Sequence, residues 1–196
     1  MTHDLLITNG TVVDGTGRER FRADVAVSAG RIVGIGDIKG AATKVIDARG
    51  FIVCPGFVDP HTHYDAQITW DRLLSSSAEH GITTVAMGNC GVGIAPCKPA
   101  AREMLIDDLV TVEGIDKDVL AQGIEWSWET FPEYIDAAEK RGCALNLAFL
   151  APIAPLRTYV IGSAANERAA TPAETKTMAG LLRDAMEAGA WGFSTT

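Results

Sequence analysis

Short alternating runs of apolar and polar residues fill the first fifty positions and predict β-strands. An Asn-Gly pair at residues 9–10 and an Ala-Gly-Arg triplet at residues 29–31 separate neighbouring runs, so each predicts a hairpin turn. Another strand is predicted at residues 45–48. Strands this short bury little apolar surface alone, so the module needs a second layer. We therefore expect residues 1–54 to form a small β-sandwich module.

From residue 55 onward, β-branched runs alternate with segments of helical periodicity. The strands are predicted at residues 57–63, 82–87, 144–150 and 191–194. The clearest helix begins with the capping box Thr-Pro-Ala-Glu at residues 171–174. This alternation predicts an α/β fold, with a parallel sheet whose helices are right-handed crossovers. A complete eight-fold β/α barrel needs about 250 residues. We expect residues 55–196 to be the first part of such a TIM-like barrel, truncated before closure.

Composition and charge narrow the function classes. The chain has 196 residues, with 17 basic and 25 acidic side chains and a formal net charge of −8. A nucleic-acid partner is not expected, because phosphates demand concentrated Lys and Arg. A membrane span is not expected either, because no apolar run approaches the ~20 residues it would need. Four cysteines are too few for a disulfide scaffold, and no signal peptide is visible at the start, so we expect a cytoplasmic protein.

Two histidines carry the strongest local signal. His61 and His63 lie two positions apart at the end of a predicted strand, which would place both imidazoles on one face, where they could converge on a metal such as Zn²⁺. The alternative is a pair of hydrogen-bonded histidines at the end of a sheet. Asp59 precedes the pair by two positions and would share their face. It could orient a metal-bound imidazole or cap the strand end.

A cysteine follows the next strand. Cys90 lies between glycines in the segment Gly-Asn-Cys-Gly at residues 88–91. Because the carboxyl ends of parallel strands meet at one edge of a sheet, we expect Cys90 to lie on the same rim as the histidine pair. A thiolate there would be a soft ligand for Zn²⁺, and the alternative is a buried structural thiol. The other three cysteines are interpreted as structural or incidental.

The order of these segments resembles the amidohydrolase superfamily of metal-dependent hydrolases. The segments that carry the resemblance are residues 7–15, 23–36, 55–63, 81–91 and 189–195. Within the superfamily, the Gly-Asn-Cys-Gly segment is similar to that of the N-acyl-D-amino-acid deacylases, also called D-aminoacylases. The resemblance implies a distorted β/α barrel with a small β domain assembled from both ends of the chain. It also implies hydrolysis of a small-molecule substrate, an N-acyl-D-amino acid, to a carboxylate and a free D-amino acid.

The resemblance further implies roles for individual residues. The cysteine matching Cys90 binds zinc tightly with two histidines from later strands, and the pair matching His61 and His63 lines a second, weaker metal position. A general-base aspartate lies near the last barrel strand, beyond the positions that this sequence matches. We therefore expect an N-terminal portion that is inactive alone and that needs a complementing C-terminal segment or forms a homo-oligomer.

Two alternatives stay open on the sequence alone. His61 and His63 would serve another amidohydrolase, such as a cyclic amide hydrolase, equally well. The chain could also be a non-catalytic, truncated metal-binding relic. Cys90 after the second barrel strand favours the deacylase over the cyclic amide hydrolase.

Overall fold

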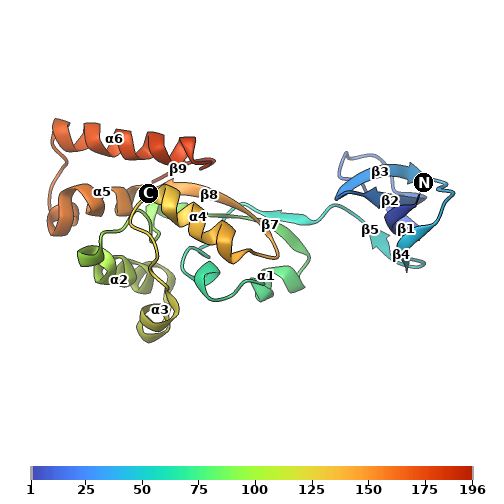
Figure 1. Ribbon diagram of the computed structural model, residues 1–196, viewed down its shortest axis with the longest axis horizontal. Helices are drawn as coiled ribbons and strands as arrows, with labels where there is room; N and C mark the ends of the chain where they lie inside the picture. The colour runs from blue at the N-terminus through green and yellow to red at the C-terminus, as the bar shows by residue number, and fades with distance from the viewer. Residues whose placement is uncertain (1, 196) are drawn as a thin grey trace. The chain divides into compact units, whose positions relative to one another are not determined.

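The computed structural model describes residues 2–195. The chain divides into two compact units, the first ending at Gly56 and the second beginning at Phe57. Figure 1 shows strands alone in the first unit and strands with helices in the second. No helix in the part of the chain that the structure describes is long and apolar enough to cross a bilayer.

The first unit is one five-stranded sheet. Its strands are β1 (His3–Val12), β2 (Phe21–Ser28), β3 (Arg31–Gly36), β4 (Ala42–Asp47) and β5 (Ile52–Val53). The order is β3-β2-β1-β4, and β5 pairs with β1. The predicted hairpin between β2 and β3 is confirmed. Its two turn residues, Ala29 and Gly30, have φ values of 50° and 71°, as a type I′ turn requires.

The predicted turn at residues 9–10 is wrong, because β1 runs straight through it. The register of β1 against β2 shifts between Ile7 and Gly10, which is a β-bulge. Asn9 takes the left-handed conformation (φ 60°), and its N–H donates to the Asp24 carboxylate at 2.9 Å. An Asn-Gly pair favours positive φ, and a bulge uses this preference as readily as a turn does.

A two-layered sandwich is not confirmed for the first unit, because its described strands form a single sheet. Eight large apolar residues of this sheet and its loops are exposed: Val13, Ile32, Val33, Ile35, Val45, Ile46, Phe51 and Ile52. Exposed apolar residues in this number are typical of a surface that packs against another layer.

The second unit has the predicted α/β fold. Its strands are β6 (Phe57–Asp59), β7 (Ile82–Met87), β8 (Asn146–Pro152) and β9 (Gly192–Ser194). They form a curled sheet in the order β6-β7-β8-β9, and each neighbouring pair is parallel. The parallel sheet with helical connections is confirmed, and Figure 1 shows the helices around β7, β8 and β9.

Six α-helices connect these strands within residues 2–195. They are α1 (Ser75–Glu79), α2 (Arg102–Glu113), α3 (Lys117–Gly123), α4 (Phe131–Arg141), α5 (Ile153–Ile161) and α6 (Pro172–Glu187). Short 3-10 turns lie at Gln67–Thr69, Asn89–Gly91, Pro99–Ala101 and Gly162–Asn166. The predicted capping box of α6 is confirmed, since the Thr171 hydroxyl accepts from the N–H of Glu174, whose carboxylate accepts from the N–H of Thr171. Helix α4 has the same arrangement at Thr130 and Glu133.

An aromatic cluster fixes α4 against the sheet. Trp128 and Tyr134 are buried with ring centroids 5.1 Å apart, and Tyr134 meets Phe149 of β8 edge to face at 5.6 Å. The Tyr134 hydroxyl donates to the carbonyl of Asp65 at 2.9 Å. The cluster therefore ties α4 both to β8 and to the segment that follows β6.

Candidate metal centre

The histidine pair lies just beyond β6. The predicted strand at residues 57–63 is too long, because β6 ends at Asp59 and Pro60, which has no N–H to donate to a sheet, follows it. His61 and His63 therefore do not alternate along a strand. The N–H of Thr62, between them, still donates to a carbonyl of β7 at 3.0 Å. This bond holds the segment against the sheet, and the two imidazole centroids lie 5.5 Å apart.

The structure brings Cys90 to this pair. Cys90 lies in the turn after β7, and its Sγ is 3.1 Å from Nε2 of His61. One donor atom from each of His61, His63 and Cys90 lies within 4.8 Å of the others. Their gathering at the carboxyl ends of β6 and β7 agrees with the edge expected for a parallel sheet.

The turn that carries Cys90 is packed closely against β8. Gly88 has φ 82°, and a Cβ built there would lie 2.1 Å from the backbone oxygen of Leu150. The Asn89 side chain donates to the carbonyls of Thr62 and Ala86 at 3.3 and 3.1 Å. Glycine is therefore required at position 88, and Asn89 links the Cys90 turn directly to the segment between the two histidines.

Glu113, the last residue of helix α2, contacts His63 and so joins the site from a helix and not from the sheet. Its Oε1 lies 3.3 Å from Nε2 of His63. Burial lowers the pKa of His63, the Glu113 carboxylate opposes that shift, and the neighbouring His61 adds to it. The second ring nitrogen of His63, Nδ1, is buried and has no hydrogen-bond partner. A buried imidazole nitrogen with a lone pair and no partner is an available ligand atom.

Asp65 lies beneath the turn and was not identified from the sequence. Its side chain is buried, and Oδ2 accepts from the N–H of Gly88 at 3.2 Å. Burial raises the pKa of Asp65 to about 7, although the bond from Gly88 opposes this. Its place two residues after His63, in the run His-Tyr-Asp, was the available signal.

Asp59 contacts the site through the main chain. Its Oδ1 accepts from the N–H of His61 at 3.1 Å, a bond that closes the turn after β6. The sequence left open whether Asp59 would orient an imidazole or cap the strand end, and this hydrogen bond is of the capping kind.

The remaining cysteines lie outside the three-residue group. Cys97 is buried, and burial raises the pKa of its thiol to about 11, so it stays protonated at neutral pH. Cys54 is exposed, and Cys143 is intermediate in burial. His80 hydrogen-bonds through Nδ1 to the carbonyl of Ser76 at 2.6 Å, at the end of α1.

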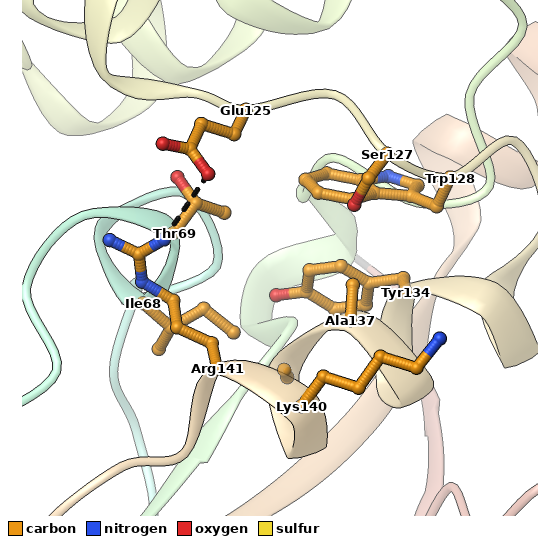
Figure 2. A pocket seen from close by; sticks show the side chains of 10 residues that line it. Ile68, Thr69, Glu125, Ser127, Trp128, Tyr134, Ala137, Lys140 and Arg141 are labelled. Atoms are coloured by element: carbon orange, nitrogen blue, oxygen red, sulfur yellow. Dashed lines mark hydrogen bonds and ion pairs between the residues drawn. The ribbon is translucent and has the colours of Figure 1, made fainter.

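A cavity of about 260 Å³ lies apart from the metal-ligand group. Figure 2 shows Trp128 and Tyr134 on one side of it and the ion pair of Glu125 with Arg141 on the other. Arg141 ends α4 and precedes β8, so it lies near the amino ends of the strands. None of the three candidate ligands lines this cavity.

Comparisons with known proteins agree with this geometry. The pattern described as "Amidohydrolase family" matches residues 44–196. The D-aminoacylase of Alcaligenes xylosoxydans xylosoxydans is 36% identical over 193 residues, which is 98% of this chain and 37% of that protein. The N-acyl-D-aspartate deacylase of the same organism is also 36% identical, over 98% of this chain and 36% of its own length. The chain thus spans little more than a third of these relatives.

Solved structures agree as well. A crystal structure of D-aminoacylase superposes with a TM-score of 0.82 at 34% identity, over 98% of this chain and 38% of that one. The N-acyl-D-glutamate deacylase of Bordetella bronchiseptica, solved with zinc and a phosphonate inhibitor, has a TM-score of 0.81 at 36% identity and covers all of this chain, which spans 38% of that protein. From the matched family pattern and this likeness along its length, the chain belongs to the amidohydrolase family.

Proposed function

We propose that His61, His63 and Cys90 bind a divalent metal ion, and that the ion is Zn²⁺. The observation that carries the proposal is the convergence of their three donor atoms within 4.8 Å, from two segments separated in the sequence. The buried Nδ1 of His63, which lacks a partner, supports it. Two imidazoles and a thiolate suit zinc, whereas magnesium and calcium prefer oxygen ligands.

Two carboxylates would orient the ligands. Glu113 would fix the His63 ring through Nε2 and leave Nδ1 as the donor atom, which is the usual arrangement of carboxylate, histidine and metal. Asp59 would act more indirectly, by holding the main chain of His61 through its N–H. Both are proposed as supports of the ligands rather than as ligands.

The reaction that we propose is hydrolysis of the amide bond of N-acyl-D-amino acids. The relatives named D-aminoacylase and N-acyl-D-aspartate deacylase match almost the whole chain, and the similar N-acyl-D-glutamate deacylase was solved with zinc. When bound, zinc supplies a Lewis acid that polarises a carbonyl and lowers the pKa of water. The residues of this chain would hold and orient that ion. Cys90 and these relatives favour a deacylase over a cyclic amide hydrolase or a relic.

The active enzyme would need more than the described segments. We propose that the four-stranded sheet is the first part of a TIM-like barrel, with residues 1–54 as half of a small β-sandwich module. A complementing segment would add strands to both and would supply further histidine ligands and the general-base aspartate. The exposed apolar residues of the first sheet and its loops support this, because they offer surface for a second layer.

Metal analysis tests the site. We would measure zinc per chain by elemental analysis after purification in reducing buffer, for the unmodified chain and for Cys90→Ala and His61→Ala/His63→Ala variants. Cys54→Ala is the matched control, because Cys54 is an exposed cysteine outside the group. We expect near-stoichiometric zinc that is lost in the two site variants and kept in the control. A folded, zinc-free chain, or zinc unaffected by Cys90→Ala, would contradict the proposal.

A chimaera tests the reaction. We would join this chain to the part of the Alcaligenes D-aminoacylase that it does not match, and assay N-acyl-D-amino acids, their L enantiomers and a hydantoin. We expect hydrolysis of the D compounds that is abolished by Cys90→Ala but not by Cys54→Ala. Zinc-loaded chimaera that is inactive on the D compounds, or that prefers the hydantoin, would reject the deacylase proposal.

A further inference from the structure

Cys90 is held in a backbone conformation that an L-residue rarely adopts. Its φ is 54° and its ψ is 20°, in the left-handed region. Only glycine enters this region freely, because the Cβ of other residues crowds the neighbouring peptide. Such strain persists only where the surrounding structure imposes it, and it is concentrated at functional sites. Some contact must therefore hold the turn closed around Cys90.

Ser194 provides contacts on both sides of Cys90. Its hydroxyl donates to the carbonyl of Gly88 and accepts from the N–H of Gly91 at 3.2 Å. Ser194 lies at the end of β9 and is buried, with 9% of its surface exposed. The Ser194 hydroxyl thus links Gly88, two residues before Cys90, to Gly91, the residue directly after it. Ser194 itself lies more than a hundred positions further along the chain.

Two other residues bond the turn on the side before Cys90, and His61 meets the Cys90 thiol itself. Asp65 accepts from the N–H of Gly88, and the Asn89 side chain donates to the carbonyls at residues 62 and 86. After Cys90, the N–H of Val92 donates to the Asn89 carbonyl at 3.1 Å within the turn, and the bond from Gly91 to Ser194 is the one that ties this side to another strand. Without the bond to Ser194, only the local bond from Val92 to Asn89 would oppose rotation of the peptide after Cys90 and relaxation of the left-handed conformation.

We propose that Ser194 is a positioning residue that holds the Cys90 turn closed, so that Sγ stays beside the His61 imidazole before any metal arrives. This inference rests on the proposed metal site. Ser194 would not contact the ion. It would act through the backbone on either side of Cys90. The turn would then be ordered already, and metal binding would not have to supply the free energy of ordering it.

Hydrogen exchange in the metal-free chain tests the clamp itself. We would compare Ser194→Ala with Ser77→Ala, which makes the same change at a serine of similar burial whose hydroxyl bonds Tyr64 instead. Loss of two buried hydrogen bonds predicts roughly tenfold or faster exchange at the Gly91 amide in Ser194→Ala, and no local change in the control. Unchanged protection of Gly91 would overturn the proposal.

A double variant separates strain from general destabilisation. Glycine adopts φ 54° freely, so in a Cys90→Gly background the closed turn is not strained and depends less on the hydrogen bonds of Ser194. We expect Ser194→Ala to accelerate exchange at Gly91 several-fold less there than in the chain with Cys90. An equal acceleration in both backgrounds would mean that Ser194 does not oppose strain at Cys90, and would overturn that part of the argument.

Cobalt binding tests the consequence for the metal. We would titrate Co²⁺ and follow the thiolate-to-cobalt charge-transfer absorption. Ser194→Ala is expected to weaken affinity roughly tenfold to a hundredfold and to reduce this band at saturation, whereas Ser194→Thr, which keeps the hydroxyl, should recover both. Faster exchange with unchanged affinity would overturn the positioning role. If the unmodified chain binds no cobalt, the proposed metal site fails, while the exchange results still decide whether the clamp exists.

Discussion

A single methyl group at Gly88 tests the close contact between the Cys90 turn and β8. In Gly88→Ala, the new Cβ would meet the backbone oxygen of Leu150 at 2.1 Å, so β8 or the turn must move. The positive φ of 82° adds about 1–2 kcal/mol for any L-residue. Relieving a clash with a packed backbone adds about 1–3 kcal/mol. We therefore expect a loss of about 2–5 kcal/mol in the free energy of unfolding.

Gly114 offers the matched control. It has φ 66° and ψ 20°, close to the 82° and 20° of Gly88, but its added Cβ would meet nothing within 4 Å. Gly114→Ala should therefore cost only the backbone part, about 1–2 kcal/mol.

Urea denaturation followed by tryptophan fluorescence measures both variants. All four tryptophans lie in the second unit, so the signal reports on the unit that contains both glycines. If Gly88→Ala proves no more destabilising than Gly114→Ala, the packing of the turn against Leu150 is wrong.

Three further predictions follow from contacts around the site and in α6. Glu113→Gln removes the charge beside His63, and cobalt competition should show roughly tenfold to hundredfold weaker binding; unchanged affinity would exclude an orienting role. Tyr134→Phe leaves a buried carbonyl without its donor and should lower the free energy of unfolding by about 1–3 kcal/mol, measured in urea; no loss would contradict that bond. The Arg168 guanidinium lowers the pKa of Glu174 from 4.5 to about 2, so the stability from this carboxylate is complete above pH 4.5 and disappears as the pH falls towards 2. Thermal melting between pH 6 and pH 3 should therefore fall less steeply in Glu174→Gln than in the unmodified chain, and equal slopes would argue against the pair.

Features set by neighbouring residues could be predicted from the sequence. The capping box at Thr171 and Glu174 and the turn at residues 29–30 depend on side chains a few positions apart. The order of strands and helices fixed the parallel sheet, and with it the edge where Cys90 meets the histidines. By contrast, the bulge at Asn9 depends on Asp24 of the neighbouring strand, which a local Asn-Gly signal does not include.

The supports of the site could not be predicted for a related reason. Glu113 reaches His63, and Asp65 and Ser194 reach the Cys90 turn, only after the elements that carry them have packed together. Glu113 and Ser194 carry no local pattern that specifies these contacts, and the only signal for Asp65 was its place two residues after His63. Helix α5 was also missed, because residues 153–161 are apolar on nearly every side and show no amphipathic period. Tertiary packing, and not propensity, sets these features.

The central claim is that Cys90 and the two histidines bind one zinc ion. X-ray absorption at the zinc edge, on the chain loaded with one equivalent of zinc, tests this most directly because it identifies the ligand atoms. We predict one sulfur at about 2.3 Å and two imidazole nitrogens at about 2.0–2.1 Å, with the sulfur lost in Cys90→Ala. A spectrum without sulfur, or one with sulfur that Cys90→Ala leaves unchanged, would contradict the account.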